Sequence, residues 1–396
     1  MIKKRSLILL LGCMVIFFPG AFLFGFPGIM PGHWQANLGA SKSDIGRIMF
    51  FILIGTGFSM YMAGKLQQRL PFHYLIFTGS LICSLVMFYA ARAGSMIDIY
   101  AWGFIAGFFS GFIYVPALTV VQIIFLPKTG LPIGMINLTF GGAAALFSPV
   151  FSVLLIEKGP LAATDTAAWT ALILGTSVAL LVRIPRQEGE TRPRARVSPS
   201  LNFKQTVRLK PFWYLWFAWA FAGASGISMI VLSSAIGQNL GFDMASYVYI
   251  LTGFNIMNGA GRLICGRLAD SLPKQKILMT CFLISASAYL MLCLSHHLLV
   301  VSCLAALVGL SFGAMFTVSA PLVSECFGLE NFGPVFGLVF TAYGFVAGCI
   351  GPWLSGVLLD VTQGNFNLVF VYFALLYLAA AGLIIRVKPV PVGYRG

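Results

Sequence analysis

The sequence contains few charged residues, which make up only 9% of its 396 positions. A soluble globular protein typically carries about 25% Asp, Glu, Lys and Arg. Hydrophobic residues account for 59% of the chain, and the mean hydropathy is +0.92. This composition excludes an ordinary soluble domain and predicts an all-α, polytopic membrane protein.

The sequence also lacks the patterns that mark metal binding or catalysis. The eight cysteines show no C-x-x-C spacing and lie in or beside apolar segments, so we interpret them as packing residues. There is no H-E-x-x-H motif and no pair of carboxylates within an apolar segment. We therefore expect no enzymatic activity, no cofactor and no metal site.

Hydropathy divides the chain into twelve candidate transmembrane spans. They are residues 7–31, 44–64, 73–92, 98–125, 131–156, 166–184, 211–239, 245–267, 276–295, 298–326, 333–359 and 366–386. A segment rich in proline and positive charge separates the sixth span from the seventh. We therefore expect a six-helix bundle over 1–184, a basic linker over 185–210 and a second six-helix bundle over 211–396.

Positive charge is distributed unevenly between the two sides of these spans. Of the 25 Lys and Arg residues, only Lys42, Arg47, Arg92 and Lys158 fall in loops, or at the ends of spans, on the side opposite the N-terminus, and Arg262 falls inside a span. By the positive-inside rule, both termini and the linker should be cytoplasmic. The net charge of +14 thus indicates orientation in a membrane, the inner membrane for a bacterial source, and not binding of nucleic acid.

The two halves share glycine and proline positions at a nearly constant spacing. At a shift of 202 residues Gly64-Lys65-Leu66 falls on Gly266-Arg267-Leu268, and at a shift of 203 Gly134 falls on Gly337. Shared Gly and Pro positions indicate duplicated helix geometry, so the bundles should be pseudo-symmetric. Parallel repeats with a site between them at the midplane are typical of alternating-access carriers.

One arginine, Arg262, lies inside an apolar span and away from its ends. Asn255, Asn258 and Arg262 follow at i, i+3 and i+7 and therefore share one helical face. Because an arginine in lipid is costly, Arg262 should face the protein interior or a watery cavity, where a cation beside two amides suits an anion. A structural role near the inner end of the helix, with Arg262 paired to Asp270 or to a loop carboxylate, is the alternative.

Other polar and aromatic residues are candidates for contact with a substrate. Tyr114 and Tyr343 have hydroxyl groups that can donate to an anion, although packing between helices explains them equally well. Asn137 fits a hydrogen bond between helices, and Phe140 and Phe340 are candidate cavity walls. At the cytoplasmic side we expect Glu325 to pair with Arg267.

Two sequence motifs resemble those of a known family. Gly266-Arg267-Leu268-Ala269-Asp270, followed by Lys274, resembles the loop motif of the major facilitator superfamily, and the whole chain looks like this superfamily. The resemblance implies twelve helices in two bundles, with a gating role for Gly266, Arg267 and Asp270. The first-half copy, from Gly64 to Arg69, has Gln68 where the motif usually has aspartate.

A narrower resemblance concerns the eighth and eleventh spans. Asn258-Gly-Ala-Gly-Arg262 and the segment from Cys326 to Gly344 are similar to the oxalate:formate antiporter and monocarboxylate porter families. This resemblance implies that Arg262 binds a substrate carboxylate. Tyr343 stands where the oxalate type has a lysine, so a single cation favours a monoanion over a dianion.

These observations together predict a secondary transporter of small monocarboxylates such as lactate or pyruvate, working by proton symport. Exchange of organic anions of the oxalate:formate type is the first alternative, and drug efflux is the second. The expected partners are a small organic anion, protons and the lipid bilayer. We expect the transporter to be monomeric.

Overall fold

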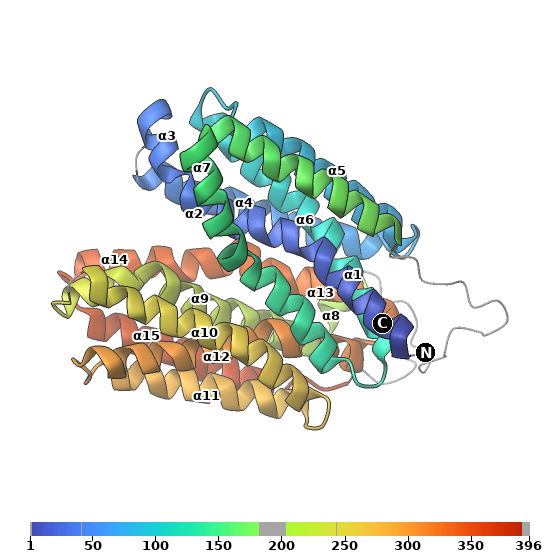
Figure 1. Ribbon diagram of the computed structural model, residues 1–396. Coiled ribbons are helices and arrows are strands. Elements are labelled where there is room, and N and C mark those ends of the chain that lie inside the picture. Colours follow the sequence, from blue (N-terminus) through green and yellow to red (C-terminus); the bar gives the residue numbers. More distant parts are fainter. Residues whose placement is uncertain (1, 41, 182–202, 243, 390–396) are drawn as a thin grey trace. The chain divides into compact units, whose positions relative to one another are not determined.

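The computed structural model describes residues 2–40, 42–181, 203–242 and 244–389, which form helices and loops without a strand (Figure 1). The helices of the first half are α1 (Ile2–Gly20), η1 (Ala21–Gly25), α2 (Phe26–Ile29), α3 (Pro31–Leu38), α4 (Lys42–Leu66), α5 (Phe72–Ala90), α6 (Met96–Phe125) and α7 (Gly130–Leu181). Those of the second half are α8 (Phe203–Arg208), α9 (Lys210–Asn239), α10 (Met244–Ala269), α11 (Lys274–Leu292), α12 (Leu298–Phe327), η2 (Leu329–Asn331), α13 (Phe332–Thr341), η3 (Ala342–Ala347), η4 (Cys349–Trp353), α14 (Leu354–Val361) and α15 (Phe366–Ile384).

The helices account for the twelve expected spans. Among the described residues, ten helical segments are long and apolar enough to cross a membrane. One of them, α7, contains two spans, because Gly159 interrupts it with a φ of 78° directly before Pro160. The remaining span is α10, which is less apolar because it carries polar residues, among them Asn255, Asn258 and Arg262. The prediction of an all-α, twelve-span fold is confirmed.

The repeat in the sequence sets the ends of the helices. α5 and α11 are offset by 202 residues at both ends, as are α6 and α12. α5 begins directly after Pro71 and α11 directly after Pro273, so an equivalent proline fixes the start of each helix. α6 begins at a capping box in which Ser95 and Asp98 bond to each other's backbone N–H.

The chain divides into two compact units. Unit 1 comprises Met1–Leu126, Met135–Ala195 and Phe332–Gly337, and unit 2 comprises Pro127–Gly134, Arg196–Asn331 and Leu338–Gly396. Each unit therefore includes a short segment from the other half of the chain. Most of the expected linker, 185–210, lies outside the described residues; its described part begins with α8.

Each unit has its own packing. In unit 1, the ring of Phe26 lies between Trp34, Trp102 and Phe151, with centroids 5.7, 5.0 and 5.4 Å away. In unit 2, α12 packs along α10 and α11, and α15 packs along α9 and α11. These contacts fix the helices that carry the candidate site.

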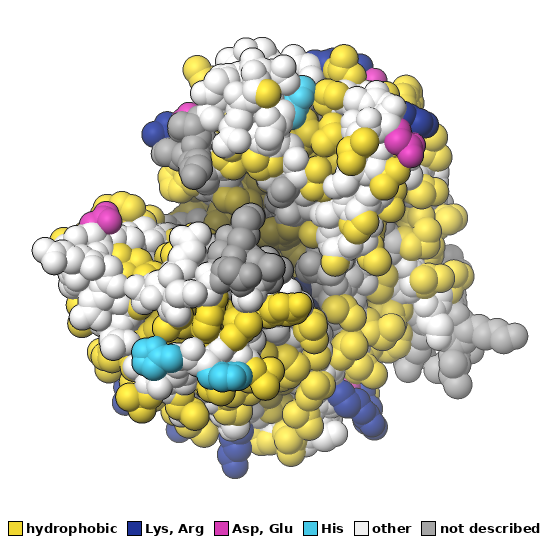
Figure 2. All heavy atoms as spheres, turned by 60° about the vertical axis from the view of Figure 1, so that its left-hand side comes forward, with side chains coloured by type: hydrophobic (Ala, Val, Ile, Leu, Met, Phe, Trp, Pro, Cys, Tyr) yellow, Lys and Arg dark blue, Asp and Glu magenta, His cyan; other side chains and the backbone are white. Residues whose placement is uncertain are grey.

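Large hydrophobic side chains also cover the outside of the protein. Leu146, Ile156 and Trp353 are 69%, 84% and 69% exposed. Figure 2 shows hydrophobic side chains over much of the visible surface, with few charged ones among them. Such exposure suits contact with lipid and would be costly in water.

Candidate substrate-binding site

Arg262 is buried in unit 2, with only 6% of the residue exposed. Its Nε donates a hydrogen bond to Oδ1 of Asn258, one turn earlier on α10, over 3.3 Å. Its guanidinium carbon Cζ lies 5.6 Å from the centroid of the Phe316 ring of α12. A cation over an aromatic face is stabilised by the ring quadrupole, so Arg262 is held by an amide and a ring.

Glycines allow α10 and α12 to approach closely enough for this contact. A Cβ atom on Gly313 would collide with the carbonyl oxygen of Asn258, and one on Gly309 with that of Phe254. Gly313 lies three residues before Phe316, and Asn258 four residues before Arg262. The close crossing at Gly313 and Asn258 therefore places Phe316 beside Arg262 one turn further along.

Phe316 belongs to a cluster of four aromatic rings in unit 2, which we call the aromatic group: Trp219, Phe316, Phe340 and Tyr343. The Phe316 and Tyr343 rings meet edge to face at 5.3 Å and 86°, and Trp219 lies 5.3 Å from Phe316. Phe340 lies 5.7 Å from Tyr343 and 5.5 Å from Trp219. The indole N–H of Trp219 donates to Ser319 Oγ at 2.9 Å, which fixes the orientation of its ring.

Tyr343 belongs to η3, a stretch of π-helix. Single turns of π-helix are often found at functional sites, because they rotate side chains out of α-helical register. Gly223 on α9 leaves room for the ring: a Cβ there would lie 2.9 Å from Tyr343 Cδ2. Tyr343 and Arg262 share a neighbour, because both contact the ring of Phe316. The structure therefore brings Arg262, Asn258, Phe340 and Tyr343 together.

Asn255, the remaining amide on this helix, is exposed. Among the described residues, no hydrogen bond joins it to Arg262. It shares the helical face expected from its spacing but is not part of the cluster around the guanidinium.

Tyr114, Asn137 and Phe140 form a separate cluster in unit 1. The hydroxyl of Tyr114 donates to Asn137 Oδ1 at 2.5 Å, and both residues are fully buried. The ring of Phe140 lies 5.0 Å from that of Tyr114. This arrangement agrees with the expected role of Asn137 in a hydrogen bond between helices.

The loop motif of the second half caps a helix. Asp270 accepts hydrogen bonds from the backbone N–H groups of Gly130, at 2.7 Å, and Leu131, at 3.2 Å, at the start of α7. A carboxylate at this position interacts favourably with the helix dipole. Gly266 permits the approach, since a Cβ there would lie 2.7 Å from the carbonyl oxygen of Gly130. Both carboxylate oxygens of Asp270 are thus engaged by α7.

The first-half copy makes the equivalent approach without a carboxylate. A Cβ on Gly64 would collide with the backbone of Gly333, and one on Gly333 with the amide of Gln67. Arg69 and Arg267 are both exposed. The expected pair of Glu325 with Arg267 is wrong: Glu325 instead lies 2.7 Å from Nζ of Lys274, the first residue of α11, which packs along α12.

Phe316 and Trp219 were not among the residues expected from the sequence. The repeat contains a signal for Phe316, because a shift of 202 places Tyr114 on it and a shift of 203 places Phe140 on Tyr343. The Tyr114–Phe140 contact of unit 1, 5.0 Å, therefore matches the Phe316–Tyr343 contact of unit 2, 5.3 Å. No sequence pattern distinguishes Trp219.

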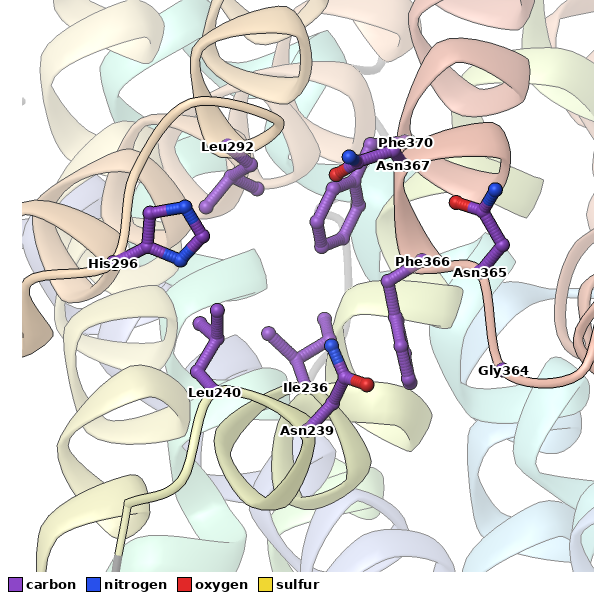
Figure 3. Close-up of a pocket in the computed structure, with 10 residues that line it drawn as sticks. All are labelled: Ile236, Asn239, Leu240, Leu292, His296, Gly364, Asn365, Phe366, Asn367 and Phe370. Atoms are coloured by element: carbon purple, nitrogen blue, oxygen red, sulfur yellow. The ribbon is translucent and has the colours of Figure 1, made fainter.

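A cavity of about 190 Å³ lies elsewhere in unit 2, where α9 and α11 end and α15 begins. Figure 3 shows His296 and Phe370 on different sides of its opening, with Asn239 and Asn365 at other edges. Asn365 Oδ1 accepts the N–H of Leu368 and so caps α15. None of the expected substrate-binding residues lines this cavity.

Comparisons with known proteins agree with this architecture. The family model of the Major Facilitator Superfamily matches residues 9–247 and 218–395. The crystal structure of the transporter FucP in the outward conformation has a TM-score of 0.72 at 14% identity, covering 96% of this chain and 99% of that one. The crystal structure of the human organic anion transporter MFSD10 has a TM-score of 0.69 at 15% sequence identity, and it covers 96% of this chain and 99% of that one.

Three curated relatives are also similar. The MFS-type transporter YhjX of Escherichia coli is 26% identical over 324 residues, 80% of each chain. The oxalate:formate antiporter of Oxalobacter formigenes is 26% identical over 229 residues, 57% of this chain and 53% of that one. Monocarboxylate transporter 13 of Rattus norvegicus is 24% identical over 388 residues, 94% and 88% of the two chains.

The apolar helices and these matches show that the chain is a multi-pass membrane transporter and not an enzyme. The chain belongs to the Major Facilitator Superfamily. Members of this class carry small organic substrates across a membrane.

Proposed function

We propose that this transporter carries small monocarboxylate anions and that Arg262 binds their carboxylate. The observation that supports this proposal is the setting of Arg262, a buried guanidinium beside an amide and an aromatic ring inside a membrane span. An arginine in such a place is expensive and is functional by default. Its planar fork suits a carboxylate, which it binds with two parallel hydrogen bonds.

The aromatic group supports a monoanion with a small apolar part. Rings at this position exclude water and offer dispersion contact, but they supply no second positive charge for a dianion. The relatives point to the same chemistry, since two of them are named for oxalate and formate exchange and for monocarboxylate transport. Transport would proceed by alternating access, which is typical of carriers built from repeated helix bundles.

Proton symport is the coupling that we favour, because a proton can travel with the substrate's own carboxyl group. Exchange of one anion for another is the main alternative and would need no proton gradient. Drug efflux is the second alternative; one relative, AgnL12 of Paecilomyces divaricatus, is named an efflux protein.

Uptake into liposomes tests the proposal. Labelled lactate, pyruvate, formate and oxalate would each be supplied with and without an inward proton gradient, to wild type and to Arg262→Gln. We expect acid-stimulated uptake of a monoacid that is lost in the variant. Uptake that needs internal anion but no gradient would mean exchange, and preference for oxalate would contradict the monoanion proposal. Transport of an organic cation, unaffected by Arg262→Gln, would indicate efflux instead.

A further inference from the structure

The short helix α8 is held against the start of α9 by its buried face. Thr206 and Leu209 are 1% and 5% exposed. The indole Nε1 of Trp213, in the first turn of α9, donates to the carbonyl oxygen of Val207 over 2.7 Å. α8 is thus a fixed extension of the span Lys210–Ser233, located where that span begins.

The outer face of this extension is strongly basic. Lys204, Arg208 and Lys210 are exposed, and residues 203–217 contain neither aspartate nor glutamate. The ion pairs found in the described part of the chain involve none of the three cations. Lys204 and Arg208 are four residues apart, so they lie on the same side of α8.

Exposed aromatic side chains lie beside these cations. Phe203, Trp213 and Phe217 are 48%, 39% and 40% exposed, and the rings of Trp213 and Phe217 lie 5.8 Å apart. At the beginning of a transmembrane span, exposed aromatic rings are typical of the boundary between headgroups and acyl chains. The surface therefore combines a cationic part with an apolar part next to the hydrocarbon.

We propose that α8 and the first two turns of α9 form a binding site for anionic phospholipids, with Lys204, Arg208 and Lys210 contacting the phosphate headgroup. Basic segments beside a span attract anionic lipids electrostatically. Trp213 and Phe217 contact the upper acyl chain. A free phosphate would use the cations alone, whereas a lipid uses both parts of the surface, so a lipid fits better.

Fluorescence quenching of the full-length protein in lipid nanodiscs tests this site. The discs would contain phosphatidylcholine with a small, varied fraction of phosphatidylglycerol, and either lipid would be brominated near the headgroup end of its acyl chains. The contribution of Trp213 is the difference between wild type and Trp213→Phe. We expect brominated phosphatidylglycerol to quench Trp213 at much lower mole fraction than brominated phosphatidylcholine.

The variant Lys204→Gln/Arg208→Gln/Lys210→Gln should remove this preference. Each cation near the surface contributes about fivefold in affinity, so the triple variant should lose on the order of a hundredfold. The matched control is Lys276→Gln/Arg386→Gln/Lys388→Gln, which removes the same charge from exposed positions elsewhere in unit 2. Its preference should remain close to that of wild type.

Three results would overturn the proposal. Equal quenching by both lipids would mean that there is no headgroup selectivity, and an equal loss in the control variant would mean a general charge effect. Competition by millimolar inorganic phosphate would indicate a phosphate site and not a lipid site. If the triple variant fails to fold, a salt titration of wild type decides instead: the preference must vanish at high ionic strength, where charges on the surface are screened.

Discussion

Arg262 and Phe316 form a cation–aromatic pair, with the guanidinium carbon 5.6 Å from the ring centroid. Tyr343 meets the same ring edge to face, and Asn258 holds Nε of the arginine. These contacts fix the direction of a charge that would otherwise sample many rotamers. Pre-organisation of this kind lowers the entropic cost of binding an anion.

Removing the Phe316 ring should weaken substrate binding. Cation–π contacts are worth about 0.5 to 2 kcal/mol, so Phe316→Leu should raise the half-saturation concentration for uptake by roughly 2- to 30-fold. Phe316→Tyr keeps the ring and should remain close to wild type. Phe345→Leu, at a position that is 37% exposed, is the matched control. Equal transport by Phe316→Leu and wild type would show that the ring does not support Arg262.

The close approach of α7 to α10 should be intolerant of a methyl group at Gly134. A Cβ at this position would collide with the carbonyl oxygen of Arg262. Overpacking typically costs about 1 to 3 kcal/mol, so Gly134→Ala should lower the thermal midpoint and reduce uptake. Gly142→Ala is the control on the same helix, because its nearest neighbour would be Leu138 Cδ1 at 4.0 Å. Similar behaviour of the two variants would contradict the importance of this crossing.

Asp270 should stabilise the protein through the start of α7. Its carboxylate accepts two backbone N–H groups, so thermal midpoints should fall from wild type to Asp270→Asn to Asp270→Ala. A carboxylate at a helix N-terminus contributes up to about 2 kcal/mol of stability when it is partly buried. The loss of stability in Asp270→Asn, which removes only the charge, should therefore not exceed this value. Asp360→Asn, at an exposed position, controls for the loss of charge. An asparagine variant as stable as wild type would leave Asp270 without a capping role.

Tyr114 and Tyr343 should respond differently to loss of their hydroxyl groups. Tyr114→Phe removes the donor to buried Asn137 and should cost about 1 to 3 kcal/mol of stability. The Tyr343 hydroxyl makes no hydrogen bond to another described residue, so Tyr343→Phe should leave the thermal midpoint nearly unchanged and weaken uptake. A large loss of stability in Tyr343→Phe, with transport kinetics unchanged, would make this residue structural.

The sequence predicts the helices well because the length of each apolar segment and the positions of prolines set where a helix begins and ends. α5 and α11 begin after equivalent prolines, and the repeat carries their length from one half to the other. The interruption at Gly159 falls between two expected spans. Residues 127–134 and 332–337 join the other unit through tertiary contacts, which hydropathy does not encode.

The candidate site was only partly predictable. Arg262 stands out because a charge in an apolar span is rare, and its spacing from Asn258 gives their shared face. Phe316 is one of 36 phenylalanines, and only its equivalence with Tyr114 distinguishes it. Tyr343 lies on a π-helical turn and its ring packs against Gly223, a residue more than a hundred positions away, so its placement rests on a contact that the local sequence does not show.

Equilibrium binding of a labelled monoacid would show whether Arg262 holds the substrate. The acid with the fastest uptake would be titrated against purified wild type, Arg262→Lys and Arg262→Gln, with thermal midpoints measured in parallel. We predict saturable binding to wild type and weaker binding to the lysine variant, which keeps the charge but loses the planar fork. The glutamine variant should show no saturable binding while remaining folded. Binding to folded Arg262→Gln with wild-type affinity would mean that Arg262 does not hold the substrate carboxylate.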